Sequence, residues 1–185
     1  MVNLNSKLDD MLASPLTALG WTAILAPVPD GTLMELGVWQ GSSFREICSQ
    51  VYPRKVYGFD WWRGLPEEWE FGGAGVGDMG GAPPLCPNNG EFIIGLVEDT
   101  LPDFVVSHAP AAFVHFDLDL YAPTAAALAC LKFAPGAILV FDEIVGADRN
   151  VRHEQRAFRE WLTRSNQDFE LIGQRHPESW VVQLK

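Results

Sequence analysis

The sequence predicts an α/β fold built on a seven-stranded, mostly parallel sheet with helices on both faces. Two observations carry this prediction. Short apolar runs alternate with stretches of helical periodicity, which is the pattern of βαβ units. Five of these runs also end in acids, as expected where buried parallel strands open into a ligand crevice at their carboxyl ends. The acids are Glu35, Asp60, Glu98 with Asp99, Asp117 with Asp119, and Asp142 with Glu143.

The first half of the chain predicts one βαβ unit behind a short leading helix. Apolar residues at helical spacing over 4–19 predict that helix, within an N-terminal helical segment spanning 1–20. The unit consists of a strand over 33–38, a helix over 42–51 and a strand over 56–60. The stretch 63–90 is rich in Gly and Pro, which favours an irregular, lid-like loop. A disordered insertion without a role is the alternative.

Strands and helices continue to alternate in the second half. The predicted elements are a strand over 92–97, a helix over 101–107, a strand over 111–118, a helix over 123–133, a strand over 137–144 and a helix over 150–165. Two further strands, over 169–173 and 180–184, follow with a short connection between them. Strands joined in this way pair antiparallel, so we expect the last strand to oppose its parallel neighbours. The whole chain, 1–185, is expected to form a single domain, because this length supports one sizeable core.

Composition narrows the class of ligand. The chain carries 13 Lys and Arg against 24 Asp and Glu, a formal charge of −11. This balance disfavours nucleic acid as a partner, because binding to phosphates depends mainly on Lys and Arg. Small neutral or cationic ligands and metal ions fit it better. No apolar stretch reaches the roughly 18 to 20 residues that span a bilayer, and the N-terminus lacks a signal-peptide layout.

The three cysteines indicate the compartment. Cys48, Cys86 and Cys130 are odd in number and have no CxxC spacing, so neither a disulfide framework nor a zinc site is predicted. We therefore expect a soluble, cytoplasmic protein without a membrane partner. A homodimer that completes the pocket is also compatible with a chain of this length.

The segment 35–43, ELGVWQGSS, lies where a strand gives way to a helix. Gly37 and Gly41 allow the backbone to approach a ligand closely. The segment lacks GxGxxG and has no Lys, so it matches neither a dinucleotide fingerprint nor a P-loop. Asp60 ends the next strand, a position where acids commonly accept hydrogen bonds from ribose hydroxyls. This acid strengthens the case for a ribose-containing ligand.

On five runs the chain resembles the macrocin O-methyltransferase family of class I S-adenosylmethionine-dependent methyltransferases. The runs are ELGVWQGSS, GFDWWRGLPEEW, GLVEDTLPDF, HFDLDLYAPTAAALACL and PGAILVFDE. The similarity is strongest over about 32–143. It implies a Rossmann-like class I methyltransferase fold and transfer of a methyl group from S-adenosylmethionine to a hydroxyl of a small molecule, such as a sugar or secondary metabolite.

The resemblance also implies roles for individual residues. The implied cofactor-binding residues are Glu35, Gly37, Gly41, Ser42, Asp60, Trp61, Glu98 and Asp117. Asp60 would hold the ribose and Glu98 would lie near the adenine. A divalent cation, usually Mg²⁺, would be held by Asp117, Asp142 and Glu143, hard oxygen ligands that suit Mg²⁺ or Ca²⁺. Asp117 is also the candidate catalytic residue, since a cation on the acceptor oxygen would lower its pKa and orient it.

Two positions depart from the family's pattern. Trp61 and Trp62 follow Asp60 where the family commonly has Ser-Phe, and Glu143 replaces a second Asp. No residue stands out as a general base. His115 is more readily interpreted as a core histidine and His153 as a solvated helix residue.

Other activities fit fewer motifs. Asp117 and Asp119 match the DxD of nucleotide-sugar glycosyltransferases, but that interpretation leaves the glycine segment without a role. A phosphatase would need Gly-Thr after its DxD, and the Walker B-like ILVFDE has no Walker A partner. A methyltransferase-like module that binds the cofactor without catalysis remains an alternative.

Overall fold

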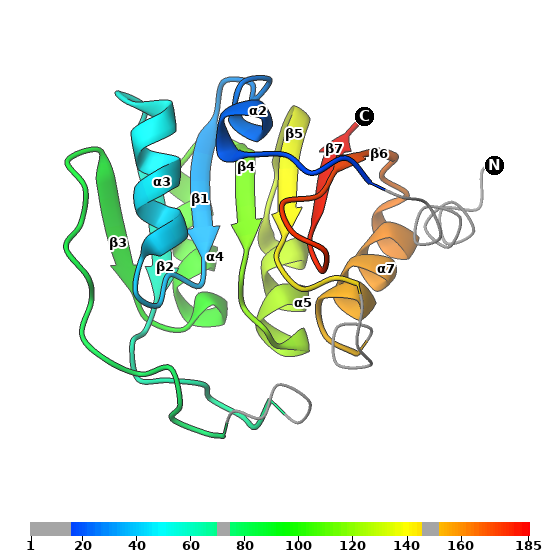
Figure 1. Cartoon of the computed structure of the whole chain (residues 1–185). Helices are drawn as coiled ribbons and strands as arrows, with labels where there is room; N and C mark the ends of the chain where they lie inside the picture. The colour runs from blue at the N-terminus through cyan, green and yellow to red at the C-terminus, as the bar shows by residue number, and fades with distance from the viewer. Residues whose placement is uncertain (1–15, 70–74, 146–151) are drawn as a thin grey trace.

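One sheet organises the part of the chain that the structure describes. The computed structural model describes residues 16–69, 75–145 and 152–185. Its seven strands lie in the order β3-β2-β1-β4-β5-β7-β6 (Figure 1). They are β1 (Thr32–Leu36), β2 (Val56–Asp60), β3 (Gly90–Ile94), β4 (Ala111–Phe116), β5 (Phe133–Phe141), β6 (Phe169–Gly173) and β7 (Trp180–Leu184). Strands β1 to β5 are parallel, and β7 is antiparallel to both β5 and β6, which confirms the predicted sheet.

Helices cover both faces of the sheet (Figure 1). The described helices are α2 (Trp21–Leu25), α3 (Ser42–Val51), α4 (Val97–Ser107), α5 (Tyr121–Cys130) and α7 (Glu154–Ser165). Apolar side chains of α2 and α3 pack on one face, and those of α4, α5 and α7 pack on the other. The result is the three-layered architecture of an open α/β sheet.

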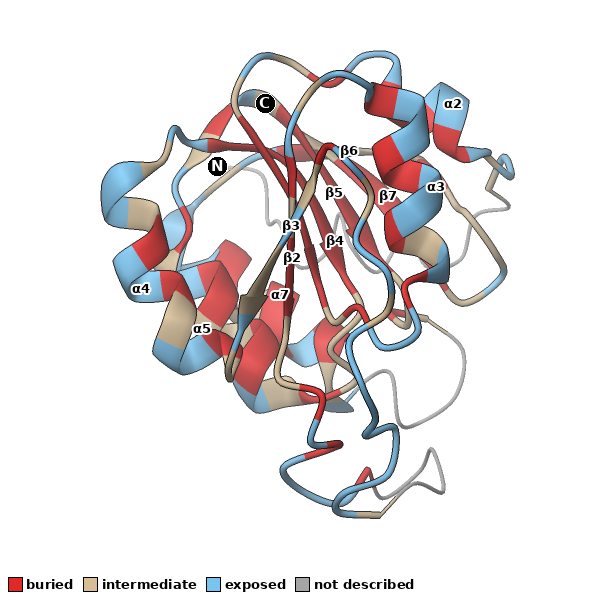
Figure 2. Cartoon of the chain, turned by 90° about the vertical axis from the view of Figure 1, so that its left-hand side faces the viewer, coloured by how far each residue is buried: buried red, intermediate tan, exposed pale blue. Residues whose placement is uncertain are grey.

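The central strands are buried along their whole length. Every residue of β1 and β4 is buried, and Figure 2 shows the sheet enclosed between its helical layers. Strands covered on both faces are usually continuous apolar runs. Glu35 in β1 and His115 in β4 interrupt these runs, and they are direct neighbours in the register of the two strands. Two polar groups therefore meet inside an apolar layer.

Several predicted boundaries were wrong, and the strand over 92–97 is the most consequential case. β3 ends at Ile94, Gly95 has a φ of +150°, and α4 begins at Val97. The apolar run FIIGLV is thus divided by a glycine whose backbone conformation other residues rarely adopt. Glu98 and Asp99 consequently lie in the first turn of a helix, where acids favour the helix dipole, and not at a strand end.

The remaining boundary differences are smaller. The strand over 111–118 ends at Phe116, and the helix over 123–133 is Tyr121–Cys130. The strand over 137–144 begins earlier, at Phe133, and the described part of the last helix begins its regular turns at Glu154. The leading helix predicted over 4–19 lies mostly outside the described residues; 16–19 are not helical, and the short helix α2 was not predicted.

The stretch after β2 forms an irregular loop below the carboxyl ends of the strands (Figure 1). Its described parts, 63–69 and 75–89, contain neither helix nor strand. Backbone hydrogen bonds tie its two arms together, from Leu65 N–H to Asp78 O and from Gly77 N–H to Leu65 O, each 2.9 Å long. Leu65 and Trp69 also pack against Leu120 at the start of α5. The loop is therefore anchored to the body at its side nearest the strand ends.

Candidate active site

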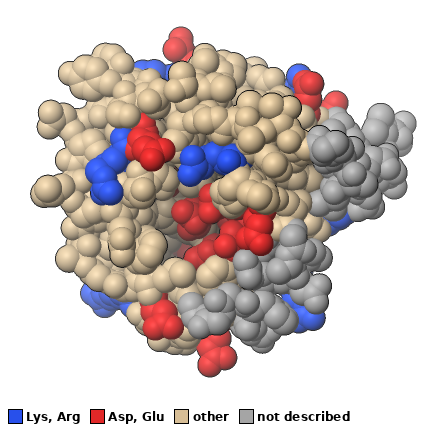
Figure 3. Space-filling model, in the orientation of Figure 1, with Lys and Arg blue, Asp and Glu red and all other residues tan. Residues whose placement is uncertain are grey.

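The carboxyl ends of the parallel strands, together with the loop, enclose a cavity of about 330 Å³. This volume falls within the range of about 300 to 1,000 Å³ that is common for small-molecule sites. Acidic side chains gather in one hollow of this face (Figure 3). The carboxylates that line the cavity belong to Asp60, Glu98, Asp117, Asp119, Asp142 and Glu143.

The glycine turn after β1 is held against two other strand ends. Gly37 has a φ of +88°, and a Cβ placed on it would lie 1.8 Å from the carbonyl oxygen of Asp117. Its N–H donates to Phe59 O (2.9 Å), and Asp117 N–H donates to Leu36 O (2.9 Å). Only glycine permits this approach, so Gly37 fixes the end of β4 as well as the turn.

Asp60 organises the backbone on both sides of the cavity mouth. Its Oδ2 accepts hydrogen bonds from Val38 N–H (2.9 Å) and Trp39 N–H (2.7 Å), and its Oδ1 accepts one from Trp62 N–H (2.8 Å). A carboxylate has about four acceptor positions, so roughly one remains for a ligand hydroxyl. Asp60 lines the cavity, as its predicted role requires.

The predicted cofactor residues divide into two groups. Those that line the cavity are Gly37, Asp60, Trp61, Glu98 and Asp117. Glu35, Gly41 and Ser42 do not line it; a Cβ on Gly41 would lie 2.9 Å from the loop residue Pro84. The roles that the sequence assigned to all eight residues remain predictions.

Glu35 lies beneath the cavity in a buried polar pair. Its Oε1 is 2.7 Å from His115 Nδ1, and both side chains are at most 1% exposed. The second oxygen, Oε2, has no hydrogen-bond partner among the described residues. Burial alone would lower the pKa of His115, but hydrogen bonds to Asp142 and Glu35 and the charge of Asp117 raise it to about 10. These contacts favour the protonated form of His115.

Asp142 accepts hydrogen bonds from two histidines through one oxygen. Its Oδ1 is 3.4 Å from His115 Nε2 and 3.0 Å from His176 Nε2. Burial would raise the pKa of Asp142, yet these hydrogen bonds outweigh burial and hold the pKa below its ordinary value. His176 lies on the β6–β7 connection, and no local pattern indicated it, because its partner is 34 residues away.

For two other acids near Asp142, Asp117 and Glu154, the pKa is raised and not lowered. Burial raises the pKa of Asp117 well above its ordinary value, and the negative charge of Asp142 adds to the effect. Burial likewise raises the pKa of Glu154, with a further contribution from Asp117. Glu154 Oε2 accepts a hydrogen bond from Glu143 N–H (3.1 Å), while its buried Oε1 lacks a partner within the described chain. Glu154, which follows a histidine at the start of a helix, was not among the predicted site residues.

These observations test whether the residues fit a divalent cation. Asp117, Asp142 and Glu143 line the same cavity, and all three offer hard oxygen donors. The negative charge of Asp142 raises the pKa of Asp117, and a bound cation would offset this repulsion. Neither histidine uses Oδ2 of Asp142. By the chemistry of its donors, this set suits Mg²⁺ or a similar ion.

A different group, Glu35, His115 and Asp117, has ligand atoms that all lie within 4.8 Å of one another; among the described residues, Asp117, Asp142 and Glu143 do not converge this closely. Two of its members already share a hydrogen bond of 2.7 Å in the core. Glu35 and His115 are buried and do not line the cavity, so the cavity-lining acids Asp117, Asp142 and Glu143 are the candidate set.

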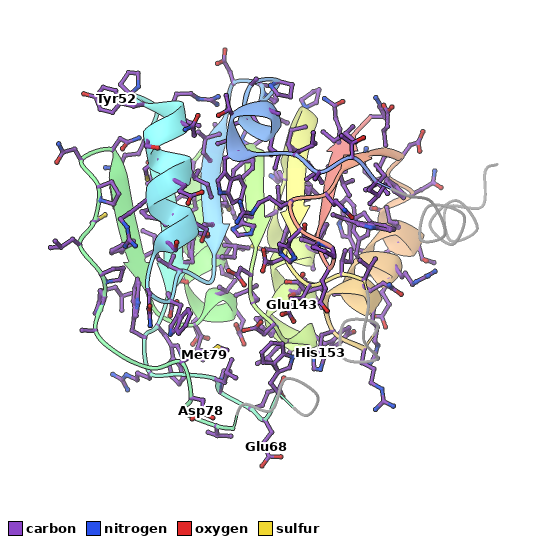
Figure 4. All side chains as sticks on the ribbon, in the orientation of Figure 1. Tyr52, Glu68, Asp78, Met79, Glu143 and His153 are labelled. Atoms are coloured by element: carbon purple, nitrogen blue, oxygen red, sulfur yellow. The ribbon has the colours of Figure 1, made fainter. Side chains whose placement is uncertain are left out.

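Aromatic and apolar side chains also line the cavity. Trp61 lines the cavity and donates through Nε1 to Gly64 O, whereas Trp62 is buried against Phe92 with ring centroids 5.0 Å apart. Leu65, Trp69 and Met79 of the loop complete this lining. Figure 4 shows Met79 on the loop and Glu143 at the lower end of the central strands. A cavity lined by both apolar and acidic side chains can bind a ligand with both kinds of surface.

His153 has a structural contact instead of a solvated position. Its Nδ1 accepts a hydrogen bond from Tyr121 N–H (3.1 Å) and so satisfies the first turn of α5. Its ring is half-buried. No role in proton transfer follows from this arrangement.

The strand order with its antiparallel last strand is that of the class I fold of S-adenosylmethionine-dependent methyltransferases. Comparison with protein families agrees, since the family described as "Methyltransferase domain" matches residues 34–144, more than half of the chain. The chain belongs to this family of methyltransferase domains. That membership removes the glycosyltransferase and phosphatase alternatives.

Solved structures share the fold over most of the chain. The calicheamicin methyltransferase CalS11 has a TM-score of 0.69 and 22% identity, covering 96% of this chain and 79% of its own. The O-methyltransferase NovP has a TM-score of 0.65 and 20% identity, covering 88% and 77%. TomG from Streptomyces achromogenes, an O-methyltransferase of tomaymycin synthesis solved with S-adenosylmethionine, has a TM-score of 0.55 and 18% identity, covering 90% and 81%. A search of curated proteins finds no match. Within the described chain, every helix is too short or too polar to cross a membrane.

Proposed function

We propose that this methyltransferase transfers the methyl group of S-adenosylmethionine to a hydroxyl oxygen of a small molecule, with the help of a divalent cation. The observation that carries the proposal is that one cavity joins the glycine turn and Asp60 to the acids Asp117, Asp142 and Glu143. A cofactor subsite and a hard-cation subsite in one cavity would bring donor and acceptor into contact.

The cofactor half lies between the ends of β1 and β2 and the start of α4. Asp60 retains acceptor capacity for ribose hydroxyls beside the turn at Gly37. Glu98 enters the cavity from the first turn of α4, next to the apolar Leu96 and Val97. An apolar surface with an acid at its edge suits an adenine ring and its amino group.

The cation half lies at the ends of β4 and β5. Asp117, Asp142 and Glu143 would hold the ion, and the bound cation would lower the pKa of the acceptor hydroxyl and orient it. These residues would then position the acceptor oxygen for in-line attack on the methyl group, and positioning of this kind can supply much of the rate.

The lining also favours a class of acceptor. Six carboxylates line the cavity, and among the described residues of that lining none is Lys or Arg. Phosphate groups are usually bound by basic side chains, so an acceptor without phosphate fits better. Leu65, Trp69 and Met79 offer an apolar wall. We infer a neutral or cationic hydroxylated molecule, such as a sugar or secondary metabolite, in agreement with the resemblance to macrocin O-methyltransferases.

Calorimetric titration with S-adenosylhomocysteine tests the cofactor half. We expect Asp60→Ala to weaken binding by about 1.5 to 3 kcal/mol, the usual worth of hydrogen bonds to a charged group. Asp103→Ala, on the exposed side of α4, is the matched control and should bind like the wild type. Equal affinity in the Asp60 variant would contradict the assigned subsite.

Methyl transfer to a panel of polyhydroxylated acceptors, before and after chelation with EDTA, tests the cation half. We expect transfer to fall on chelation and to return with Mg²⁺. Full activity after thorough chelation would remove the cation from the proposal. Cofactor binding without methylation of any acceptor would instead favour a non-catalytic binding module.

A further inference from the structure

The connection between β6 and β7 reaches the cation site from a distant part of the sequence. We propose that His176 on this connection is a positioning residue: together with His115, it fixes the Asp142 carboxylate in the orientation that binds the ion. This inference rests on the proposed function of Asp142 as a cation ligand. It adds to the site a segment that the cavity lining does not include.

The two histidines approach the same oxygen from different elements. His176 Nε2 lies 3.0 Å from Asp142 Oδ1, and His115 Nε2 lies 3.4 Å from it. His115 belongs to β4 and is 1% exposed, whereas His176 belongs to the connection and is 35% exposed. Two donors on one oxygen restrict rotation of the carboxylate, and neither of them uses Oδ2. The second oxygen can therefore bind the ion in a fixed direction.

Ser179 stabilises the turn of the connection that carries His176. This side chain is fully buried, and its Oγ accepts hydrogen bonds from Arg175 N–H (2.7 Å) and His176 N–H (2.9 Å). The same hydroxyl lies 3.1 Å from His176 O, to which it donates. The backbone of His176 is thus fixed by a neighbour three residues away, which limits the positions that the imidazole can reach.

The connection is also fastened to the segment that carries the acids. Ile144 N–H and Val145 N–H both donate to Glu178 O, at 2.9 and 3.0 Å. On the other side of this segment, Glu154 accepts from Glu143 N–H, and Gln155 Nε2 donates to Ile144 O (2.8 Å). The acids after β5 are therefore held between the β6–β7 connection and α7. Such support around ligand residues is what usually preorganises a metal site.

Mn²⁺ binding to the full-length chain, followed by electron paramagnetic resonance, tests the proposal without any methyl acceptor. We expect His176→Ala to weaken Mn²⁺ affinity by about 10- to 100-fold, as loss of a group supporting a metal ligand commonly does. His176→Gln keeps a donor of similar reach and should recover most of the affinity. His108→Ala, which removes a histidine from the end of α4, is the matched control and should bind Mn²⁺ like the wild type.

Ser179→Ala tests whether the backbone position of His176 matters for Mn²⁺ binding. It leaves the His176 side chain in place but removes the hydroxyl that closes the connection, so we expect a smaller loss of Mn²⁺ affinity. Because both residues act on one carboxylate, the effects of Ser179→Ala and His176→Ala should not add in the double variant. Additive effects would mean that the two residues act independently, which contradicts the proposal.

Titration with S-adenosylhomocysteine and thermal unfolding of each variant separate positioning from general loosening. The proposal requires cofactor affinity and melting temperature close to wild type in His176→Ala while Mn²⁺ affinity falls. A loss of cofactor affinity that parallels the loss of Mn²⁺ affinity in His176→Ala would overturn the proposal. Wild-type Mn²⁺ affinity in His176→Ala would also overturn it, but this result would leave the proposed function intact. If the wild type binds no Mn²⁺, the cation half of the proposed function fails with it.

Discussion

At the scale of single residues, some residues that line the cavity also hold the backbone around it in place. Asp60 binds three N–H groups, and Gly37 admits the carbonyl of Asp117. The sequence predicted both as cofactor residues, because their types and spacing are typical of this role. It could not predict the backbone contacts, since these depend on how separate strand ends meet. Substitution of such a residue should therefore disturb both the backbone around the cavity and the lining of the cavity.

Gly37→Ala should destabilise the fold as well as the site. The new Cβ would lie 1.8 Å from Asp117 O at a φ of +88°, so the strand end must shift and the backbone is strained. We expect a loss of at least about 2 kcal/mol in the free energy of unfolding, measured with urea. Gly81→Ala is the control, because a Cβ there meets nothing within 4 Å. Similar losses in both variants would contradict this account.

The cysteines provide a test of burial at the same scale. Cys86 is exposed, whereas Cys48 is buried in α3 and its pKa is raised to about 12, chiefly by burial. Since only the thiolate reacts, iodoacetamide at pH 8 should label Cys86 readily and Cys48 only after unfolding. Mass spectrometry of digested protein gives the order of labelling. Early modification of Cys48 would show that α3 opens locally.

The raised pKa also predicts a pH dependence with a definite sign. Unfolded Cys48 loses its proton near pH 9, but the folded protein retains it to about pH 12. Deprotonation therefore increasingly favours the unfolded state as the pH rises from about 9 to about 12. The free energy of unfolding falls over this range, because only the neutral thiol is favoured in the folded protein. Cys48→Ala should lower stability at pH 8 yet show a shallower decline between pH 9 and 11. Parallel stability profiles for the two proteins would refute the assignment.

At the scale of elements, helices and strands followed from local periodicity, and their ends did not. Gly95 divides an apolar run that resembles a single strand, so Glu98 lies in the first turn of a helix and not at a strand end. The loop after β2 was predicted from its Gly and Pro content. The packing of Trp69 against Leu120, which attaches the loop, was not predicted, because these residues are far apart in sequence. Local patterns indicate the type of an element more reliably than its contacts.

Trp69→Ala should release the loop from the body of the protein. Trp69 forms a small apolar cluster with Leu65 and Leu120, and truncation of a buried Trp costs about 3 kcal/mol or more. Limited proteolysis tracks the population of the open form, so cleavage in the loop should accelerate at least about tenfold. Leu85→Ala, at a side chain 92% exposed, is the control. Unchanged cleavage would mean that the cluster does not anchor the loop.

At the scale of the whole molecule, one sheet has an apolar core on each face and a polar cavity at the carboxyl ends of its parallel strands. One core joins the sheet to α4, α5 and α7, and the other joins it to α2 and α3. The site lies where the carboxyl ends of the parallel strands emerge between them. Because the strand ends share this edge, a ligand that binds there contacts several elements at once. Ligand binding should therefore be coupled to global stability.

S-adenosylhomocysteine should raise the melting temperature in proportion to its affinity. At a free concentration 100 times the Kd, binding to the folded state alone adds about 2.7 kcal/mol of stability. Asp60→Ala should show a smaller rise at the same concentration, and Asp103→Ala the same rise as wild type. Differential scanning calorimetry over a series of concentrations measures this. A melting temperature independent of the ligand would contradict cofactor binding in this cavity.

The sequence by itself determined the alternation of strands and helices, the antiparallel last strand and the set of acids from which the site is built. These features are encoded within about a dozen residues, where side-chain periodicity and turn chemistry act. Only the tertiary structure decided what each acid contacts. Glu35 pairs with His115 beneath the cavity because β1 lies beside β4, and Asp142 meets His176 because the β6–β7 connection reaches the end of β5. Strand order and register bring together residues 80 and 34 positions apart, and no local pattern encodes such contacts.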